Sequence, residues 1–306
     1  MRNYFSYNID FTELSDWKEG TLTVVERPDA DDYSFMEREV GVPSSFIEDI
    51  ADTDELPRVE TEGDWLLAIV RIPLRNEDDG LQFITVPVGV MARGADVVTL
   101  CFSHCNLIPD LLATMRRKHV AVRNHVDLIL WIVFTATDWF LKYLRQINSE
   151  VESDEKKLRK SITNADLIQL RDLQKTLVYF NTSIRGNQVM TDRLSSLYQE
   201  KELLDVDLLE DLVIELKQAF NTVSVYTEIL NATMDSYASI ISNNLNVIMK
   251  RMTSFSIALM IPTLVASFYG MNVINHAENS YQREFGIRNT LKKLNRQLEK
   301  SCRFFW

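Results

Sequence analysis

The sequence predicts a small α/β domain, then a long stalk helix that ends in a C-terminal membrane-spanning helix. Three observations lead to this fold class. Six of the seven prolines lie at positions 28, 43, 57, 73, 87 and 109, whereas 110–261 contains one glycine, Gly186. Because Pro and Gly interrupt helices, the first 109 residues are expected to be divided into short elements and the next region to be helical. Finally, the 20 residues 252–271 carry no charge.

Residues 1–109 are expected to form an acidic, mixed α/β domain. Segments rich in Val, Ile, Leu and Phe, bounded by Gly, Pro or acidic clusters, predict strands. These segments are 20–28, 64–74, 81–92 and 96–102. The segment 43–55 predicts a helix with a serine cap.

Charge is distributed unevenly along the chain. Residues 1–110 contain 23 Asp and Glu against 8 Lys and Arg, although the net charge of the whole chain is only −11. This acidity argues against a nucleic-acid partner, which requires clustered Lys and Arg. It indicates either a solvated surface or attraction of cations, and both interpretations are kept.

The cysteines and the N-terminus bear on the cellular compartment. Cys101, Cys105 and Cys302 are too few for a disulfide framework, which favours a reducing compartment. The first ten residues contain no apolar signal segment. We therefore expect the N-terminal domain to lie in the cytoplasm.

Residues 110–205 are expected to form a helical cytoplasmic region with a helix hairpin. The apolar run 128–138 is too short for a bilayer, which takes roughly 20 residues, so it predicts a buried core helix. The polar segment 147–167 predicts an exposed, charge-laced helix or hairpin. Gly186 predicts a helix–helix turn or a helix C-cap.

A regular apolar spacing predicts the stalk helix over 206–251. Steps of three and four, with Thr227 filling one gap, indicate a narrow seam as in a coiled coil or bundle. The seam runs into 252–271, which is long enough for a transmembrane helix and is preceded by Lys250 and Arg251 on the cytoplasmic side. The seam positions are Leu209, Leu212, Leu216, Phe220, Val223, Leu230, Met234, Tyr237, Ile241, Leu245 and Ile248.

The apolar stretch ends in the motif Tyr-Gly-Met-Asn at 269–272. A lone Gly-Met-Asn is a weak signal, but here it closes a 20-residue span that follows a long seam helix. With this combination the sequence resembles the CorA family of divalent-cation channels over nearly its whole length. The segments DTDELPRVE, before the central strands, and NVIMKRM…ALMIPTLVASFYGMN carry the resemblance.

The resemblance implies a homopentamer with a funnel-shaped cytoplasmic domain and long helices that line a pore. Gly270, Met271 and Asn272 would form a ring at the outer mouth that receives hydrated Mg²⁺. Mg²⁺ sheds water reluctantly, and amide and carbonyl groups can hydrogen-bond its hydration shell. Such binding is weak enough to release the ion, as conduction requires.

The resemblance also implies which residues line the pore. Asn246, Met249, Met252 and Met260 match the lining positions, and Asp235 matches an acidic ring nearer the cytoplasm. The methionines would form apolar constrictions that gate by dewetting. From the residues alone, ordinary helix packing explains the methionines, and a register-setting polar residue in a bundle explains Asn246.

Regulatory Mg²⁺ sites between neighbouring cytoplasmic domains are a further implication of the resemblance. Asp211 matches one such position, and its partner is expected among Glu77, Asp78 and Asp79. The alternative for these three residues is a solvated loop. Mg²⁺ is thus expected as both transported and regulatory ion, with no organic cofactor.

The tail departs from the family, which continues with a second transmembrane helix. Residues 273–306 contain seven Lys and Arg and three Glu, and no run long enough to span a bilayer. Either the tail is translated in a shifted frame or the protein is a one-span variant. We favour the first, because an outer basic tail opposes the positive-inside tendency.

Two further function classes were weighed. Cys101, His104 and Cys105 lack the second ligand pair of a zinc site and are expected to be core or turn residues. No catalytic motif is present, so an enzyme is not expected. The alternatives to a Mg²⁺ or Co²⁺ channel are a related zinc transporter and a non-conducting, single-span scaffold. The expected partners are further copies of the chain, the lipid bilayer and divalent cations.

Overall fold

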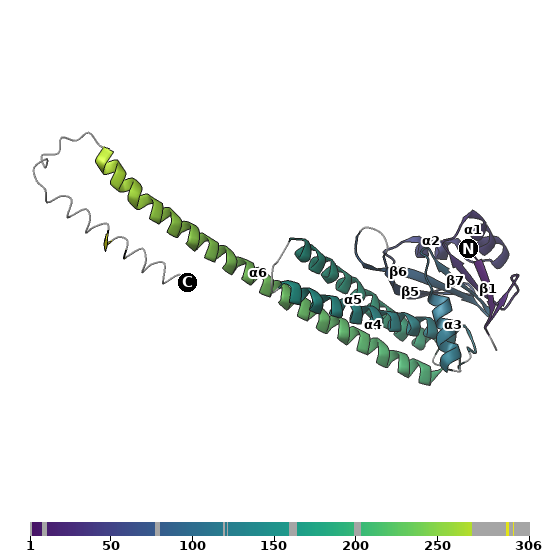
Figure 1. Ribbon diagram of the computed structural model, residues 1–306. Helices are drawn as coiled ribbons and strands as arrows, with labels where there is room; N and C mark the ends of the chain where they lie inside the picture. Colours follow the sequence, from purple (N-terminus) through teal and green to yellow (C-terminus); the bar gives the residue numbers. More distant parts are fainter. Residues whose placement is uncertain are drawn as a thin grey trace, which may run out of the picture. The chain divides into compact units, whose positions relative to one another are not determined.

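The computed structural model describes residues 2–7, 11–76, 80–118, 120, 122–158, 164–198, 203–270, 292, 293 and 296. The chain divides into two compact units, Met1–Met234 and Asp235–Trp306. The first unit contains every described strand and helices α1 to α5, with the beginning of α6. The second contains the rest of α6. The prediction of strands first and helices afterwards is therefore confirmed (Figure 1).

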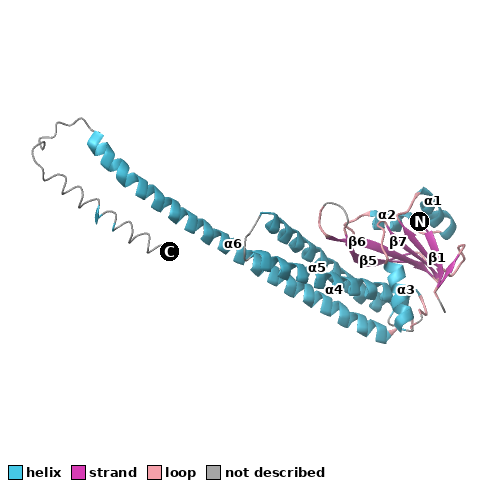
Figure 2. Ribbon diagram, viewed as in Figure 1, coloured by secondary structure: helices cyan, strands magenta, loops and turns pink. Residues whose placement is uncertain are grey.

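The described strands form one seven-stranded sheet, and the helices follow or interrupt them (Figure 2). The strands are β1 (Arg2–Ser6), β2 (Thr12–Leu14), β3 (Leu22–Glu26), β4 (Arg58–Glu62), β5 (Trp65–Arg75), β6 (Phe83–Arg93) and β7 (Asp96–Cys101). The helices are α1 (Ala30–Phe35), the π-helical turn η1 (Met36–Val40), α2 (Ser44–Ala51), α3 (Leu107–Lys118), α4 (His125–Leu158), α5 (Asn164–Tyr198) and α6 (Val206–Gly270).

The strand order is β2-β1-β3-β7-β6-β5-β4. The central pair β3 and β7 is parallel, and the other described pairs are antiparallel. The four predicted strands correspond to β3, β5, β6 and β7. The other three were not predicted, because their sequences RNYFS, TEL and RVETE are too polar to differ from loops.

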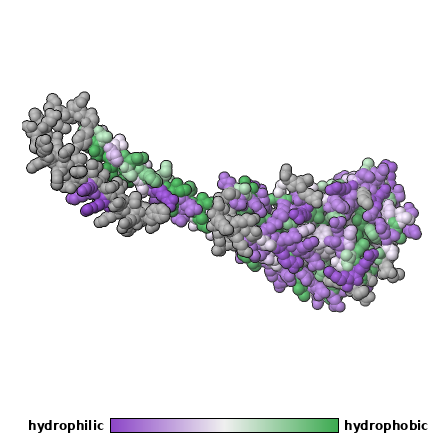
Figure 3. All heavy atoms as spheres, in the orientation of Figure 1, coloured by the Kyte–Doolittle hydropathy of each residue, from purple (hydrophilic) through white to green (hydrophobic). Residues whose placement is uncertain are grey.

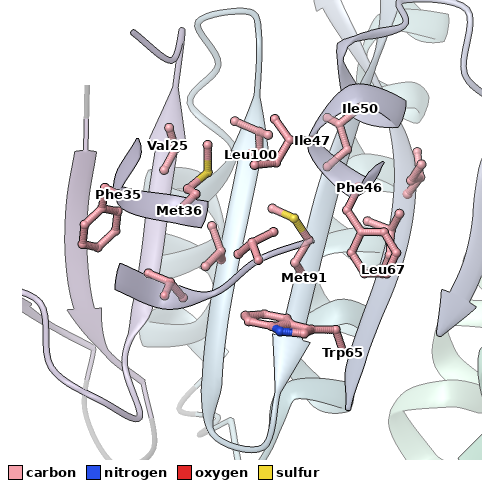
Figure 4. Close-up of a cluster of buried hydrophobic side chains, with 14 residues drawn as sticks. Val25, Phe35, Met36, Phe46, Ile47, Ile50, Trp65, Leu67, Met91 and Leu100 are labelled. Atoms are coloured by element: carbon pink, nitrogen blue, oxygen red, sulfur yellow. The ribbon is translucent and has the colours of Figure 1, made fainter. Parts of the chain in front are cut away.

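One face of the sheet packs against α1, η1 and α2. Side chains from the strands and from these helices interdigitate in a buried cluster (Figure 4). The largest contributions from the helices are Phe35, Met36, Phe46, Ile47 and Ile50, each at most 4% exposed. Burial of such apolar side chains stabilises the domain by about 1.5–3 kcal/mol each.

The opposite face packs against α4 and α5. Phe83 of β6 lies between them, with ring centroids 5.0 Å from Tyr143 of α4 and 6.3 Å from Phe180 of α5. The prediction of a buried core helix at 128–138 is confirmed, since all but one of the side chains from Val126 to Phe140 are at most 9% exposed. The predicted hairpin corresponds to α4 followed by α5.

Two predictions about helix ends were wrong. Gly186 lies in the interior of α5, not at a turn, and a Cβ there would lie 2.8 Å from Cδ and Cγ of Pro57. The glycine therefore permits close packing rather than chain reversal. No serine caps α2, because its N-cap is Pro43 and no side-chain hydrogen bond closes it.

The next residue of α5 fixes the helix to the sheet. Asn187 is fully buried, accepts a hydrogen bond from the backbone N–H of Arg71 (2.9 Å) and donates one to the Arg71 carbonyl (2.8 Å). Its amide thus replaces a neighbouring strand, because β4 pairs with β5 only as far as Ile69. Buried backbone groups need such partners. The contact fastens α5 to the edge of the sheet.

Candidate pore helix

Helix α6 begins at a capped and anchored end. The Asp205 side chain accepts a hydrogen bond from the Leu208 N–H (3.1 Å), which satisfies a free donor of the first turn. Arg123 forms ion pairs with Asp205 and with Asp127 at the start of α4. The hydrogen bond to Asp127 raises the pKa of Arg123. The first turn of α6 is therefore fixed to the helical bundle of its own chain.

The first part of α6 packs through the predicted seam. Leu212, Leu216, Val223 and Leu230 are at most 1% exposed. On the same helix, Asn231 accepts a hydrogen bond from Gln174 of α5 (2.7 Å). The seam is confirmed as far as Tyr237, which is 4% exposed and is the last buried side chain of α6.

Beyond Tyr237 the helix has a different environment. All described side chains from Ser242 to Phe268 are exposed except Ala258 and Ile261, which are partly exposed. Leu245 and Ile248 were predicted to continue the seam but are 57% and 56% exposed, so one chain does not bury them. Hydrophobic side chains gather along this part of the helix (Figure 3). Among the described helices, α6 alone is long and apolar enough to cross a membrane.

The hydroxyl groups of this outer part are satisfied by the helix itself. Thr253, Ser256 and Thr263 donate to the carbonyls four residues earlier, at 2.9–3.0 Å. Such bonds remove the cost of placing hydroxyls in hydrocarbon. Pro262 lies inside the helix, so the carbonyl of Ala258 has no donor at the usual position. Neighbouring helices can tolerate this arrangement in a membrane.

Most of the predicted pore-lining residues share one side of α6. Asp235, Asn246 and Met260 lie within about 40° of one another, because an α-helix turns roughly 100° per residue. Met249 lies about 60° from Asn246, whereas Met252 lies about 80° from Met260. Met249, Met252 and Met260 are 67%, 64% and 67% exposed. Tyr237 follows Asp235 by two positions, so the buried side chain and this face lie on opposite sides of the helix.

The remaining predicted ion-binding residues are only partly described. Gly270 is the last residue of α6, and Met271 and Asn272 lie outside the described residues. Asp211 is exposed on α6, and its expected partners Glu77, Asp78 and Asp79 lie outside the described residues. So does the tail from 272 onward, apart from 292, 293 and 296. In the described part of the chain, no three His, Cys, Asp or Glu side chains are grouped to hold a metal ion.

The segment 101–105 adopts the expected core-and-turn environment. Cys101 and Cys105 are 3% and 6% exposed, whereas His104 is exposed. Their neighbour Glu26 was not predicted, because it lies far away in the sequence. Only the parallel pairing of β3 with β7, which makes Glu26 the register partner of Cys101, brings it close.

Comparison with curated proteins gives two clear relatives. The cobalt/magnesium transport protein CorA of Methanocaldococcus jannaschii is 27% identical over 243 residues, which covers 78% of this chain and 75% of the relative. The cobalt/magnesium transport protein CorA of Thermotoga maritima is 23% identical over 250 residues, covering 76% and 67%.

The fold is similar to that of a solved transporter. The complete structure of the CorA magnesium transporter from Methanocaldococcus jannaschii matches with a TM-score of 0.82 at 22% identity, covering 99% of this chain and 97% of that chain. A family model described as CorA-like Mg²⁺ transporter protein matches residues 23–285. The chain therefore belongs to the CorA-like Mg²⁺ transporter family, whose members are ion transporters and not enzymes.

Proposed function

We propose that the chain is one subunit of a homopentameric channel that carries Mg²⁺, and also Co²⁺, across the cell membrane. The acidic N-terminal domain lies in the cytoplasm, and α6 crosses the bilayer. The two curated relatives are both cobalt/magnesium transport proteins, which supports these ions over Zn²⁺.

The observation that carries this proposal is the exposure of α6 beyond Tyr237. An isolated helix of this composition would leave a large apolar surface in water, which folded monomers avoid. Lipid can cover its apolar sides, and copies of the same helix can cover the rest. Several copies around an axis enclose a path that one helix cannot.

The face shared by Asp235, Asn246 and Met260 suits the lining of that path. Asp235 would attract cations at the cytoplasmic end, and Asn246 would offer amide groups to a hydrated ion. Met249, Met252 and Met260 would provide apolar constrictions. At the outer end, Gly270, Met271 and Asn272 would receive the hydrated ion through hydrogen bonds rather than direct ligands.

The central test is the substitution Asn272→Ala. Purified protein is reconstituted in liposomes, and Mg²⁺ influx is followed with an internal fluorescent indicator. Asn272→Ala should abolish the influx, because the ring loses the amides that bind the hydration shell. The control Asn221→Ala changes an exposed asparagine in the first unit and should retain influx. Unchanged influx in Asn272→Ala would favour a non-conducting, single-span scaffold or a different filter.

Gating by internal Mg²⁺ is a separate part of the proposal. Mg²⁺ would bridge Asp211 to the carboxylates of Glu77, Asp78 or Asp79 in a neighbouring subunit and hold the channel closed. Rising Mg²⁺ should then protect the cytoplasmic domain against limited proteolysis. Asp211→Ala should lose this protection, whereas Asp207→Ala, one turn earlier and also exposed, should keep it. Equal protection in both variants would remove Asp211 from the regulatory site.

A further inference from the structure

Two thiols and two acid–base groups meet at the carboxyl ends of β3 and β7. Glu26 and Cys101 are the last register partners of this parallel pair. The chain after β7 turns back, so that His104 and Cys105 also lie beside Glu26. The pore face of α6 uses none of these four residues.

The two sulfurs are direct neighbours. Cys105 donates a hydrogen bond to the Cys101 sulfur, and this bond lowers the pKa of the Cys101 thiol, with help from the Ser103 N–H. The same bond, together with burial, raises the pKa of Cys105. Both cysteines are free thiols. Cys101 is therefore the thiol that ionises first, and the thiolate is the reactive form of a cysteine.

Glu26 and His104 connect this pair to solvent. Glu26 Oε1 lies 3.4 Å from the Cys105 sulfur and accepts its proton, and Oε2 lies 2.7 Å from His104 Nδ1. The side chain of Glu26 is 18% exposed, and that of His104 is 64% exposed. A proton that leaves Cys105 therefore has a continuous route from sulfur to carboxylate to imidazole to water.

A small molecule can reach the site. A pocket of about 130 Å³ is lined by Glu26, His104 and Cys105. A second void of about 10 Å³, close to the size of a water molecule, borders Cys101 and Cys105. A hydroperoxide has the size to enter both spaces.

We propose that Cys101 and Cys105 are a redox-active pair that closes to a disulfide when a hydroperoxide enters this pocket, with Glu26 and His104 relaying the proton. The Cys101 thiolate attacks the O–O bond, so that an S–O bond forms and hydroxide leaves. Glu26 then takes the Cys105 proton, and the Cys105 sulfur attacks the Cys101 sulfenic acid. The S–S bond forms, and the second hydroxide leaves with the relayed proton. Two thiols and one hydrogen peroxide give one disulfide and two water molecules.

Peptide mapping of the full-length protein tests the bond directly. The protein in detergent is exposed to hydrogen peroxide, denatured with iodoacetamide and digested with trypsin. Residues 94–116 form one tryptic peptide that contains both thiols. After peroxide it should carry no alkyl groups and lack two hydrogen atoms, and dithiothreitol should reverse this change. A peptide that still takes up two alkyl groups would overturn the proposal, as would a bond that is lost in Cys302→Ser.

Two variants test the roles within the site. Cys105→Ser should stop the reaction at a Cys101 sulfenic acid that dimedone labels. Glu26→Gln should slow disulfide formation about tenfold or more, because it keeps the side-chain size and removes the base. Glu13→Gln, an exposed change on β2, should react at the parent rate. A parent rate in Glu26→Gln, or the absence of dimedone label in Cys105→Ser, would contradict these assignments.

Discussion

Two apolar stretches of helix have opposite environments in this molecule. In α4, the side chains from Val126 to Phe140 are buried, with only Asp138 partly exposed. In α6, the side chains from Met252 to Phe268 are exposed, with only Ala258 and Ile261 partly exposed. Local chemistry does not distinguish them, because hydroxyls in both donate to carbonyls four residues earlier.

The difference shows that apolar character alone does not assign a helix to a core or to a membrane. The stretch in α4 is interrupted by Asp138, whereas 252–271 is uncharged over 20 residues. The sheet and α5 cover the first stretch within one chain. The second needs a cover that one chain does not supply, which is why we assign it to the bilayer and to an assembly.

The largest expected effect separates the two stretches by one matched substitution. Leu130→Ala in α4 removes a fully buried side chain and should lower the free energy of unfolding of the first unit by about 2–5 kcal/mol. Leu259→Ala in α6, where the leucine is 71% exposed, should change it by less than about 0.5 kcal/mol. Denaturant unfolding, followed by the fluorescence of Trp131 and Trp139, measures both. Equal losses would mean that α6 packs on its own chain.

A smaller effect is expected where one methyl group is added. Gly186→Ala should destabilise the first unit by about 1–3 kcal/mol, because the new Cβ would lie 2.8 Å from the rigid ring of Pro57. Ala266→Val, on the exposed part of α6, should leave this stability unchanged.

A double-mutant cycle checks the cause of the Gly186 effect. Pro57→Ala removes the two ring atoms that approach Gly186, so the combined variant should recover part of the loss. If Gly186→Ala costs the same with and without Pro57, the contact is not the reason for the glycine.

The sequence was informative where local pattern and environment agree. Strands β3, β5, β6 and β7 could be predicted because their residues are rich in Val, Ile and Leu. The role of Gly186 could not, since the Pro57 that requires it lies 129 positions earlier in the chain. The cluster around Cys101 was missed for the same reason, because Glu26 reaches it only through strand pairing.

The candidate pore was predictable in part. Its helix follows from the seam and from the uncharged span, and both are visible in the sequence. The end of the seam at Tyr237 was not predicted, because Leu245 and Ile248 continue the same spacing. Spacing records which residues share a face, and it does not record whether the chain itself or another molecule covers that face.

The most direct test of a membrane pore compares two positions on opposite sides of α6. Met260→Cys and Ala258→Cys, each in a Cys302→Ser background, are reconstituted in liposomes and treated with a water-soluble methanethiosulfonate. The two positions lie about 200° apart, so a pore exposes only one of them to water. We predict that Met260→Cys reacts about tenfold faster or more and that its modification reduces Mg²⁺ influx. Equal rates at the two positions, or faster reaction at Ala258→Cys, would contradict a pore lined by this face.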